Sequence, residues 1–320
     1  MTPRTILAVT DFSPRGDHAL ARAALLSAEH GAALKLACIR WPGDAAPVDA
    51  VTRLTHHALQ LSQARGTPVR AVGRLHRSLD DLRPEVVDSD LVVWGTAPVK
   101  NVRSFFLGQP VEELLRTAGR PVLVVRRPAR RAYSSLLVAV DFSDTSPALL
   151  DLSFALNTAA SVQVFHAVST ANEGKLRYAE VSANAIQAYR DQCRRQAQDR
   201  MFWLTDSFDT RRNRVQSAIS HGDAARQAWV QRERDGSELI VVGKHPGSTF
   251  SDLFFGSVAG RLLSLSDTAR AETDVLVVPH GWRPSMSVAA ASPVPTGRPL
   301  VNRIRAGATP WLASSRIARR

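Results

Sequence analysis

The sequence repeats one series of motifs twice in the same order, and this repetition limits the fold more than any other feature. Residues 6–13, an apolar run that ends in Asp-Phe-Ser, are matched by residues 136–143. Residues 91–108 are matched by residues 239–256 at a constant offset of 148, and both segments run from an apolar stretch through a proline to a glycine. A further apolar run closes each series. The order of these matches predicts two copies of one domain.

Short apolar runs alternate with longer segments of helical period in both copies. This pattern is typical of parallel strands that are covered on both faces by crossover helices, and it predicts an α/β fold. The expected strands lie near residues 5–10, 33–39, 69–75, 90–95 and 121–126 in copy one, and near 135–140, 161–167, 213–220, 238–243 and 274–279 in copy two. The expected helices lie near 15–30, 47–65, 78–88 and 109–118 in copy one, and copy two has a long second helix from about Asn172 to Ser207.

Length and charge suggest where the domains begin and end. The 320 residues correspond to about two domains. The formal net charge is +12, but residues 1–128 carry 17 basic and 12 acidic side chains, residues 129–280 carry 17 of each, and residues 281–320 carry seven basic and none acidic. The last segment is rich in proline and small residues, so it is expected to be disordered. We therefore expect domains at 1–128 and 129–280 and a basic tail at 281–320.

Composition also disfavours several classes of protein. No run of about 18 apolar residues is present to cross a bilayer. The N-terminus has no long apolar leader, so a cytoplasmic protein with no membrane partner is expected. The cysteines Cys38 and Cys193 have neither zinc-binding nor disulfide spacing. Nucleic-acid binding is expected only through the basic tail, where it would depend on salt and not on base sequence.

Candidate binding residues follow the first and fourth strands of each copy. Asp11 and Asp141 come directly after strand one, and Gly95 and Gly243 end strand four. In an open parallel sheet such positions meet where the strand order reverses, and ligands bind there. A carboxylate at this point could accept hydrogen bonds from ribose hydroxyls. The alternative is that Asp-Phe-Ser only caps the following helix.

The loop after strand four has the composition of a phosphate site in copy two. It runs from Gly243 past Gly247 to Gly256 and Ser257. Glycine lets the main chain approach an anion, and the N–H groups at the start of the next helix supply donors. The alternative is that these glycines only end a strand and begin a helix.

The equivalent loop of copy one is less suited to phosphate. Gly108 is followed by Gln109, where copy two has a serine, and Pro110 removes a backbone donor. Asp11, Gly95 and Gly108 are therefore the lesser candidates, and the main site is expected in copy two.

These motifs resemble those of the universal stress protein family: a first strand that ends in aspartate, a fourth that ends in glycine, and a glycine-containing loop that ends in Gly-Ser. The resemblance covers residues 4–127 and 134–280 and is that of a tandem member. It implies two Rossmann-like (HUP-type) five-stranded sheets with strand order 3-2-1-4-5, joined through their last strands as an internal pseudo-dimer. In some members ATP, with Mg²⁺, occupies the point of strand reversal, and other members bind no nucleotide.

Carried to this sequence, the resemblance implies a role for four residues of copy two. Asp141 would face the adenosine, Gly243 and Gly256 would line the phosphate loop, and Ser257 would donate to a phosphate.

The sequence also departs from the nucleotide-binding pattern. Pro246 stands in place of the second glycine, with Gly247 directly after it as a partial substitute. Copy one departs at Pro98 and Gln109. At most one good nucleotide site per chain is therefore expected.

Several functions are open on these grounds. The first is a non-catalytic stress-response protein that binds ATP or another adenine nucleotide and so regulates unknown protein partners. Association of two such chains into a further homodimer is an open alternative. The second is a nucleotide-free interaction scaffold, and the third is a slow ATPase or self-phosphorylating protein. No catalytic or metal-binding residue is assigned, because the usual enzyme signatures are absent from the sequence. His166, His221 and His245 are expected near strand ends of copy two, where a shared metal is a minor alternative.

Overall fold

The structure is a computed structural model that describes residues 2–41, 49–96, 110–117, 119–170, 175–176, 178–206, 208, 215–244, 258–268 and 273–282. Residues Met1–Pro284 form one compact unit. The tail expected at 281–320 lies outside the described residues apart from its first two. Among the helices described, none combines the length and apolar character needed to cross a membrane.

Strands and helices alternate along both copies, as the sequence predicts. Copy one contains β1 (Thr5–Thr10), α1 (Pro14–His30), β2 (Ala33–Ile39), α2 (Ala50–Arg65), β3 (Val69–His76), α3 (Leu79–Val87), β4 (Leu91–Gly95), α5 (Pro110–Thr117) and β5 (Val122–Val124). Copy two contains β6 (Ser135–Ala139), α6 (Ser146–Leu156), β7 (Ser161–Val168), α8 (Ala183–Asp206), β8 (Val215–His221), α9 (Ala224–Asp235), β9 (Leu239–Lys244), α11 (Val258–Thr268) and β10 (Asp274–Pro279).

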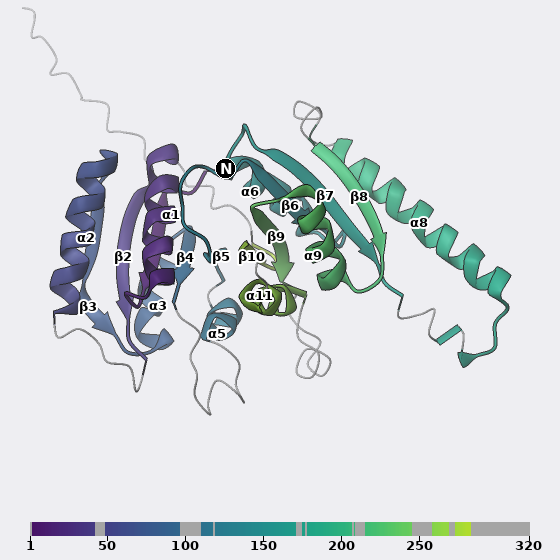
Figure 1. Ribbon diagram of the computed structural model, residues 1–320, viewed down its shortest axis with the longest axis horizontal. Coiled ribbons are helices and arrows are strands. Elements are labelled where there is room, and N and C mark those ends of the chain that lie inside the picture. Colours follow the sequence, from purple (N-terminus) through teal and green to yellow (C-terminus); the bar gives the residue numbers. More distant parts are fainter. Residues whose placement is uncertain are drawn as a thin grey trace, which may run out of the picture. The chain divides into compact units, whose positions relative to one another are not determined.

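The two sets of five strands form one continuous sheet (Figure 1). Its order is β3-β2-β1-β4-β5-β10-β9-β6-β7-β8, so each copy has the predicted order 3-2-1-4-5. Strands within each copy are parallel, whereas β5 and β10 pair antiparallel. The last strands therefore join the copies, as the family resemblance implies.

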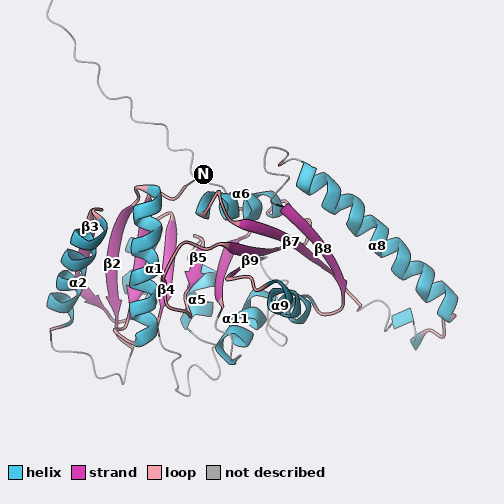
Figure 2. Cartoon of the chain, turned by 45° about the horizontal axis from the view of Figure 1, so that its top comes forward, coloured by secondary structure: helices cyan, strands magenta, loops and turns pink. Residues whose placement is uncertain are grey.

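Both faces of the sheet are covered, which explains why the strands are apolar throughout (Figure 2). Along β1, Ile6 and Ala8 belong to a core with residues of α1, α2, α6 and α8. Leu7 and Val9 point to the other face and pack with residues of α3, α5, α9 and α11. Alternate side chains of one strand thus enter two separate cores.

The long helix of copy two is shorter than predicted. A helix from Asn172 was expected, but α8 begins only at Ala183. Residues 179–180 form a turn, and Glu180 takes a left-handed backbone conformation with φ of 53° that a helix excludes. The hydroxyl of Ser182 then accepts a hydrogen bond from the N–H of Ala185 at 3.3 Å and begins the helix afresh.

A fully buried carboxylate, Asp274, fixes the junction between the copies at the start of β10. Its Oδ1 accepts hydrogen bonds from the N–H groups of Arg126 and Arg127, at 2.7 and 3.2 Å. Its Oδ2 accepts a hydrogen bond from the Tyr133 hydroxyl and lies 3.7 Å from Nε of Arg22. Burial raises the pKa of Asp274, and these bonds oppose part of that rise. One carboxylate thus ties together α1, β10 and the connecting segment, that is, residues 125–134 between β5 and β6.

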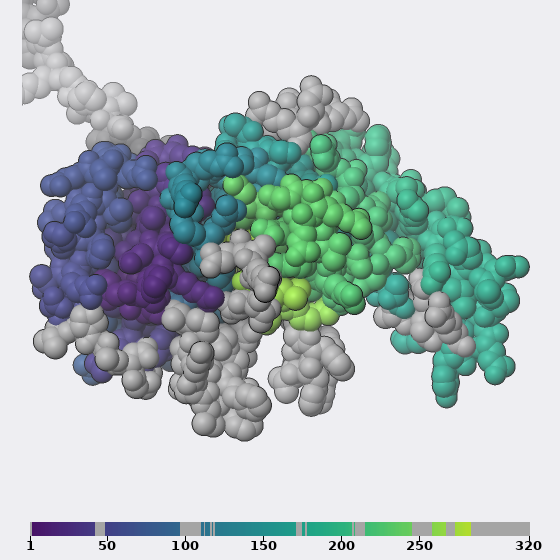
Figure 3. All heavy atoms as spheres, in the orientation of Figure 1, coloured from purple at the N-terminus to yellow at the C-terminus, as the bar shows by residue number. Residues whose placement is uncertain are grey.

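Arg22 completes this junction from the side of copy one. Its guanidinium donates to the backbone carbonyl of Arg131 at 2.7 Å and lies 3.8 Å from the centre of the Tyr133 ring. The connecting segment after β5 accordingly lies against α1 (Figure 3).

Candidate functional site

In copy one, the predicted aspartate and glycine lie at the same edge of the sheet. Thr10, the last residue of β1, pairs with Gly95, the last residue of β4, and Asp11 follows directly. The Oδ1 atom of Asp11 accepts a hydrogen bond from the N–H of Ser13 at 2.9 Å. Ser13, and not Asp11, is the N-cap of α1, since its hydroxyl accepts from the N–H of Gly16 at 3.2 Å. The carboxylate therefore shapes the turn before the cap.

The same arrangement recurs in copy two. Strands β6 and β9 are in register up to Ala139 and Val242, and Asp141 lies two residues beyond β6. Gly243 follows Val242 but does not end the strand as predicted, because β9 continues to Lys244, which still pairs with β10. These are the carboxyl ends of the two strands at which the order of copy two reverses.

The Asp141 carboxylate is held by the first residues of the following turn and helix. Its Oδ1 accepts hydrogen bonds from the N–H of Ser143 at 3.0 Å and from the hydroxyl of Ser146 at 3.2 Å. Ser146, which begins α6, is buried, whereas Asp141 is exposed. The carboxylate is thus fixed in position at the surface of the sheet edge.

A strained turn was not foreseen from the sequence. Phe12 and Phe142, which follow the two aspartates, have φ angles of 59° and 61°. This left-handed conformation costs a bulky residue on the order of 1–3 kcal/mol, and such strain is concentrated at functional sites. The Phe142 ring packs on His166 with centroids 4.3 Å apart, and the Phe12 ring stacks on His57 at 6.1 Å. The repeated Asp-Phe-Ser marks the position of this turn in both copies but does not reveal its backbone conformation.

His166 of copy two is held by the backbone at the end of strand β6. Nδ1 of His166 is 2.8 Å from the carbonyl oxygen of Val140, and burial lowers the pKa of His166, which favours the neutral ring. His221 ends β8, and His245 lies outside the described residues. No group of three or more metal-ligating side chains occurs in the described part of the chain.

The two predicted glycines have different surroundings. A Cβ atom on Gly95 would lie 2.3 Å from Cβ of Ala19 and 2.3 Å from the carbonyl oxygen of Arg15, so α1 touches β4 directly. A Cβ atom on Gly243 would meet its nearest neighbour, Cδ1 of Leu149, at an ordinary 3.6 Å. Ala19 and Leu149 occupy equivalent positions in the two copies. A side chain at Gly243 would therefore meet the Leu149 side chain at an ordinary contact distance, whereas one at Gly95 would clash with α1.

The predicted phosphate-loop residues lie outside the described residues. These are Gly108 in copy one and Gly247, Gly256 and Ser257 in copy two, and the positions Pro98, Gln109 and Pro246 fall outside as well. The helix α11 starts at Val258, directly after Ser257.

The fold defines a class: tandem Rossmann-like α/β proteins in which two parallel five-stranded sheets join through their last strands. A family model described as the universal stress protein family matches residues 2–126 and 132–279. The chain therefore belongs to the universal stress protein family.

Solved structures share this architecture at low sequence identity. A universal stress protein from Archaeoglobus fulgidus is similar with a TM-score of 0.60 and 12% identity, over 87% of this chain and 97% of that one. A functionally unknown protein from Pseudomonas aeruginosa is similar with a TM-score of 0.56 and 20% identity, over 87% of this chain and 92% of that one. No curated protein matches the sequence significantly. These likenesses concern the fold alone.

Proposed function

We propose that this protein is a non-catalytic, cytoplasmic stress-response protein that binds ATP or another adenine nucleotide through copy two. Binding would regulate its association with protein partners. Within this proposal residues 1–128 and 129–280 are the two domains, and residues 281–320 are a separate basic tail.

The observation that carries the proposal is the meeting of Asp141 and Gly243 at the point of strand reversal in copy two. A carboxylate held by Ser143 and Ser146 suits the hydroxyls of a ribose, because carboxylates accept hydrogen bonds from hydroxyl donors. Gly243 presents no side chain to the ligand. Gly247, Gly256 and Ser257 would receive the phosphates, and Mg²⁺ would be held mainly by those phosphates.

Copy two is favoured over copy one as the nucleotide site because the first helix of each copy packs differently against the fourth strand. In copy one α1 lies in direct contact with Gly95 at the end of β4. In copy two α6 lies further from Gly243. Asp11, Gly95 and Gly108 therefore remain the lesser site.

Calorimetric titration with ATP and magnesium tests this proposal. We expect one ATP to bind per chain, and we expect Gly256→Glu to abolish binding because it introduces bulk and negative charge beside the phosphates. The matched variant Gly108→Glu makes the same change in copy one and should leave binding intact. Equal loss in both variants, or loss only with Gly108→Glu, would contradict the assignment to copy two.

The second candidate is a nucleotide-free interaction scaffold. It is favoured by the hydrogen bonds that already engage Oδ1 of Asp141 and by Pro246 in the loop. Absence of heat and of thermal stabilisation at millimolar ATP would select this function.

A further inference from the structure

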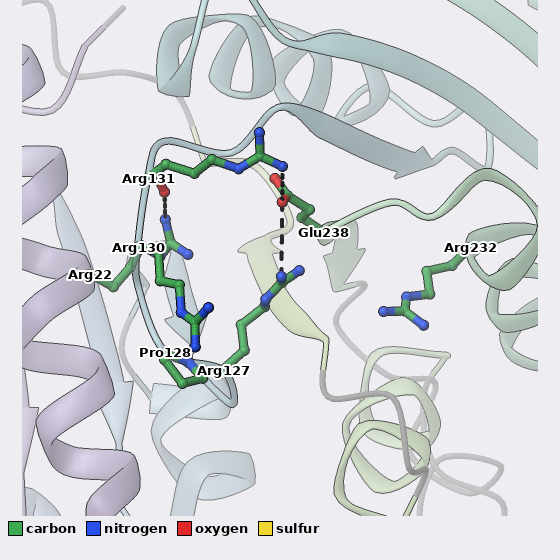
Figure 4. A pocket seen from close by; sticks show the side chains of 7 residues that line it. All are labelled: Arg22, Arg127, Pro128, Arg130, Arg131, Arg232 and Glu238. Carbon is green, nitrogen blue, oxygen red and sulfur yellow. Dashed lines mark hydrogen bonds and ion pairs between the residues drawn. The ribbon is translucent and has the colours of Figure 1, made fainter.

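A pocket of about 410 Å³ lies at the junction of the two copies (Figure 4). We call it the arginine pocket, and its lining residues are Arg22, Arg127, Pro128, Arg130, Arg131, Arg232 and Glu238. Its volume is within the range of small-molecule sites, which is roughly 300–1,000 Å³. The lining comes from α1, from the connecting segment and from the helix α9 with the residue before β9.

The arginine pocket is separate from the proposed nucleotide site of copy two. Glu238 directly precedes β9, and the pocket therefore lies at the amino ends of the strands of copy two. Asp141 and Gly243 lie at the carboxyl ends of the same strands. A ligand in the arginine pocket would consequently leave that nucleotide site accessible.

The charges that line the pocket are unbalanced. Five guanidinium groups face one carboxylate, that of Glu238. Glu238 is shared between Arg131 at 3.1 Å and Arg127 at 3.9 Å, and it also accepts a hydrogen bond from the N–H of Ser134 at 2.7 Å. Burial by itself would raise the pKa of Glu238, but the bonds from Ser134 and the two arginines hold that pKa below its ordinary value. The one carboxylate is thus ionised and fully engaged.

The other arginines of the pocket differ in whether a carboxylate balances their positive charge. Arg22 is neutralised by the buried Asp274 behind the pocket. In the part of the chain that the structure describes, no carboxylate lies within ion-pair distance of Arg130 or Arg232. With Asp274 counted, and also Glu233, whose charge acts on Arg232, five arginines stand against three carboxylates.

Arg232 is the arginine of the pocket that is best placed to pair with an anionic ligand. It is only 9% exposed, and its Nε donates to the carbonyl oxygen of Ser237 at 3.1 Å. Its guanidinium is directed toward the pocket from α9 (Figure 4). Burial, and then the like charge of Arg127, lower the pKa of Arg232, and the charge of Glu233 opposes only part of this fall. A buried cation is costly without an anionic partner, and an anion in the pocket would supply one.

We propose that the arginine pocket binds an oligophosphate, that is, an anion with two or more linked phosphate groups. Guanidinium groups pair with phosphate oxygens through two parallel hydrogen bonds, and arginine is the preferred residue for this recognition. Arginines from α1, the connecting segment and α9 surround a space larger than one phosphate occupies. The oligophosphate could be inorganic or the phosphate chain of a nucleotide. This proposal does not rest on nucleotide binding by copy two.

The test is calorimetric titration of the full chain with inorganic tripolyphosphate at low and high salt. We expect binding that weakens with salt, and we expect Arg130→Glu to weaken it by roughly tenfold or more, as the loss of a charge-assisted hydrogen bond implies. Arg130 is exposed and has no hydrogen bond to other described residues, so its replacement should not affect folding. Arg232→Gln should weaken binding as well.

Two matched controls make the same change of charge elsewhere. Arg83→Glu lies on the exposed face of α3, and Arg305→Glu lies in the basic tail. Neither should alter the affinity. Equal weakening by Arg83→Glu and Arg130→Glu, or weakening by Arg305→Glu alone, would overturn the proposal in favour of general charge attraction or of the tail.

Titrations of the Gly256→Glu variant separate the two sources of oligophosphate. Binding of tripolyphosphate that depends on Arg130 supports the proposal and shows that inorganic phosphate suffices. Binding of ATP alone, again dependent on Arg130, supports it with a nucleotide as the source. If neither ligand binds at millimolar concentration, the proposal is wrong, whether or not the wild-type chain binds ATP through copy two. Binding of a glutamate-rich peptide in their place would identify a protein partner instead.

Discussion

Replacement of Asp274 by asparagine is expected to lower the free energy of unfolding by about 3–5 kcal/mol, the usual loss when one partner of a buried ion pair is removed. Asparagine keeps the shape and one acceptor oxygen, which can still receive the N–H groups of Arg126 and Arg127. It removes the negative charge, so Arg22 is left buried beside a neutral amide. Urea denaturation followed by circular dichroism measures the change.

A double-mutant cycle shows whether the lost charge is the cause. Arg22→Met removes the unpaired cation, so the double variant Arg22→Met/Asp274→Asn should lose clearly less stability than the two single losses combined. The isosteric change Asp199→Asn, at an exposed position of α8, should leave the unfolding midpoint unchanged. Additive losses in the cycle would mean that the loss at Asp274 does not come from its charge pair with Arg22 but from its hydrogen bonds, such as the one it accepts from the Tyr133 hydroxyl.

Replacement of Gly95 by alanine is expected to destabilise the protein by about 1–3 kcal/mol or more, as overpacking of a close contact does. The new methyl group would lie 2.3 Å from both Ala19 Cβ and the carbonyl oxygen of Arg15, so α1 must move away from β4. Gly95 does not have a positive φ angle, so the cost is steric and not conformational. The unfolding midpoint in urea measures it.

The equivalent change in copy two is the matched control. Gly243→Ala places its methyl group 3.6 Å from the Leu149 side chain, an ordinary contact, and we expect an effect of less than about 0.5 kcal/mol. A similar loss in both variants would show that α6 lies as close to β9 as α1 does to β4, and would remove the argument for a more open copy two.

The sequence predicted the strands and helices because these depend on features that repeat locally. Buried parallel strands must be apolar on both faces, and the helices between them show their own period, so the alternation survives without tertiary information. The motif order then led to strand order 3-2-1-4-5 through the family resemblance. The exception was the helix expected from Asn172, where a turn at Glu180 and the cap at Ser182 move the start to Ala183.

The candidate site was predicted only in part. The placement of Asp11 beside Gly95 follows from the register that parallel pairing imposes on equivalent strand ends. The left-handed turn at Phe12 and Phe142 did not follow, because nothing in the type of these residues favours a positive φ.

What the sequence by itself determined is the repeated α/β domain, the positions of its strands and the sheet edge that the candidate aspartates and glycines share, since periodicity and motif order carry that information. The family resemblance added the order of the strands. Only the tertiary structure decided that Asp274 of copy two meets Arg22 of copy one, and that arginines from α1, the connecting segment and α9 surround one pocket. In the sequence these residues are merely charges far apart. Their structural role depends on burial and on partners distant along the chain. A charged side chain that is solvated in the unfolded chain forms strong pairs only when folding removes its water and brings a partner into contact.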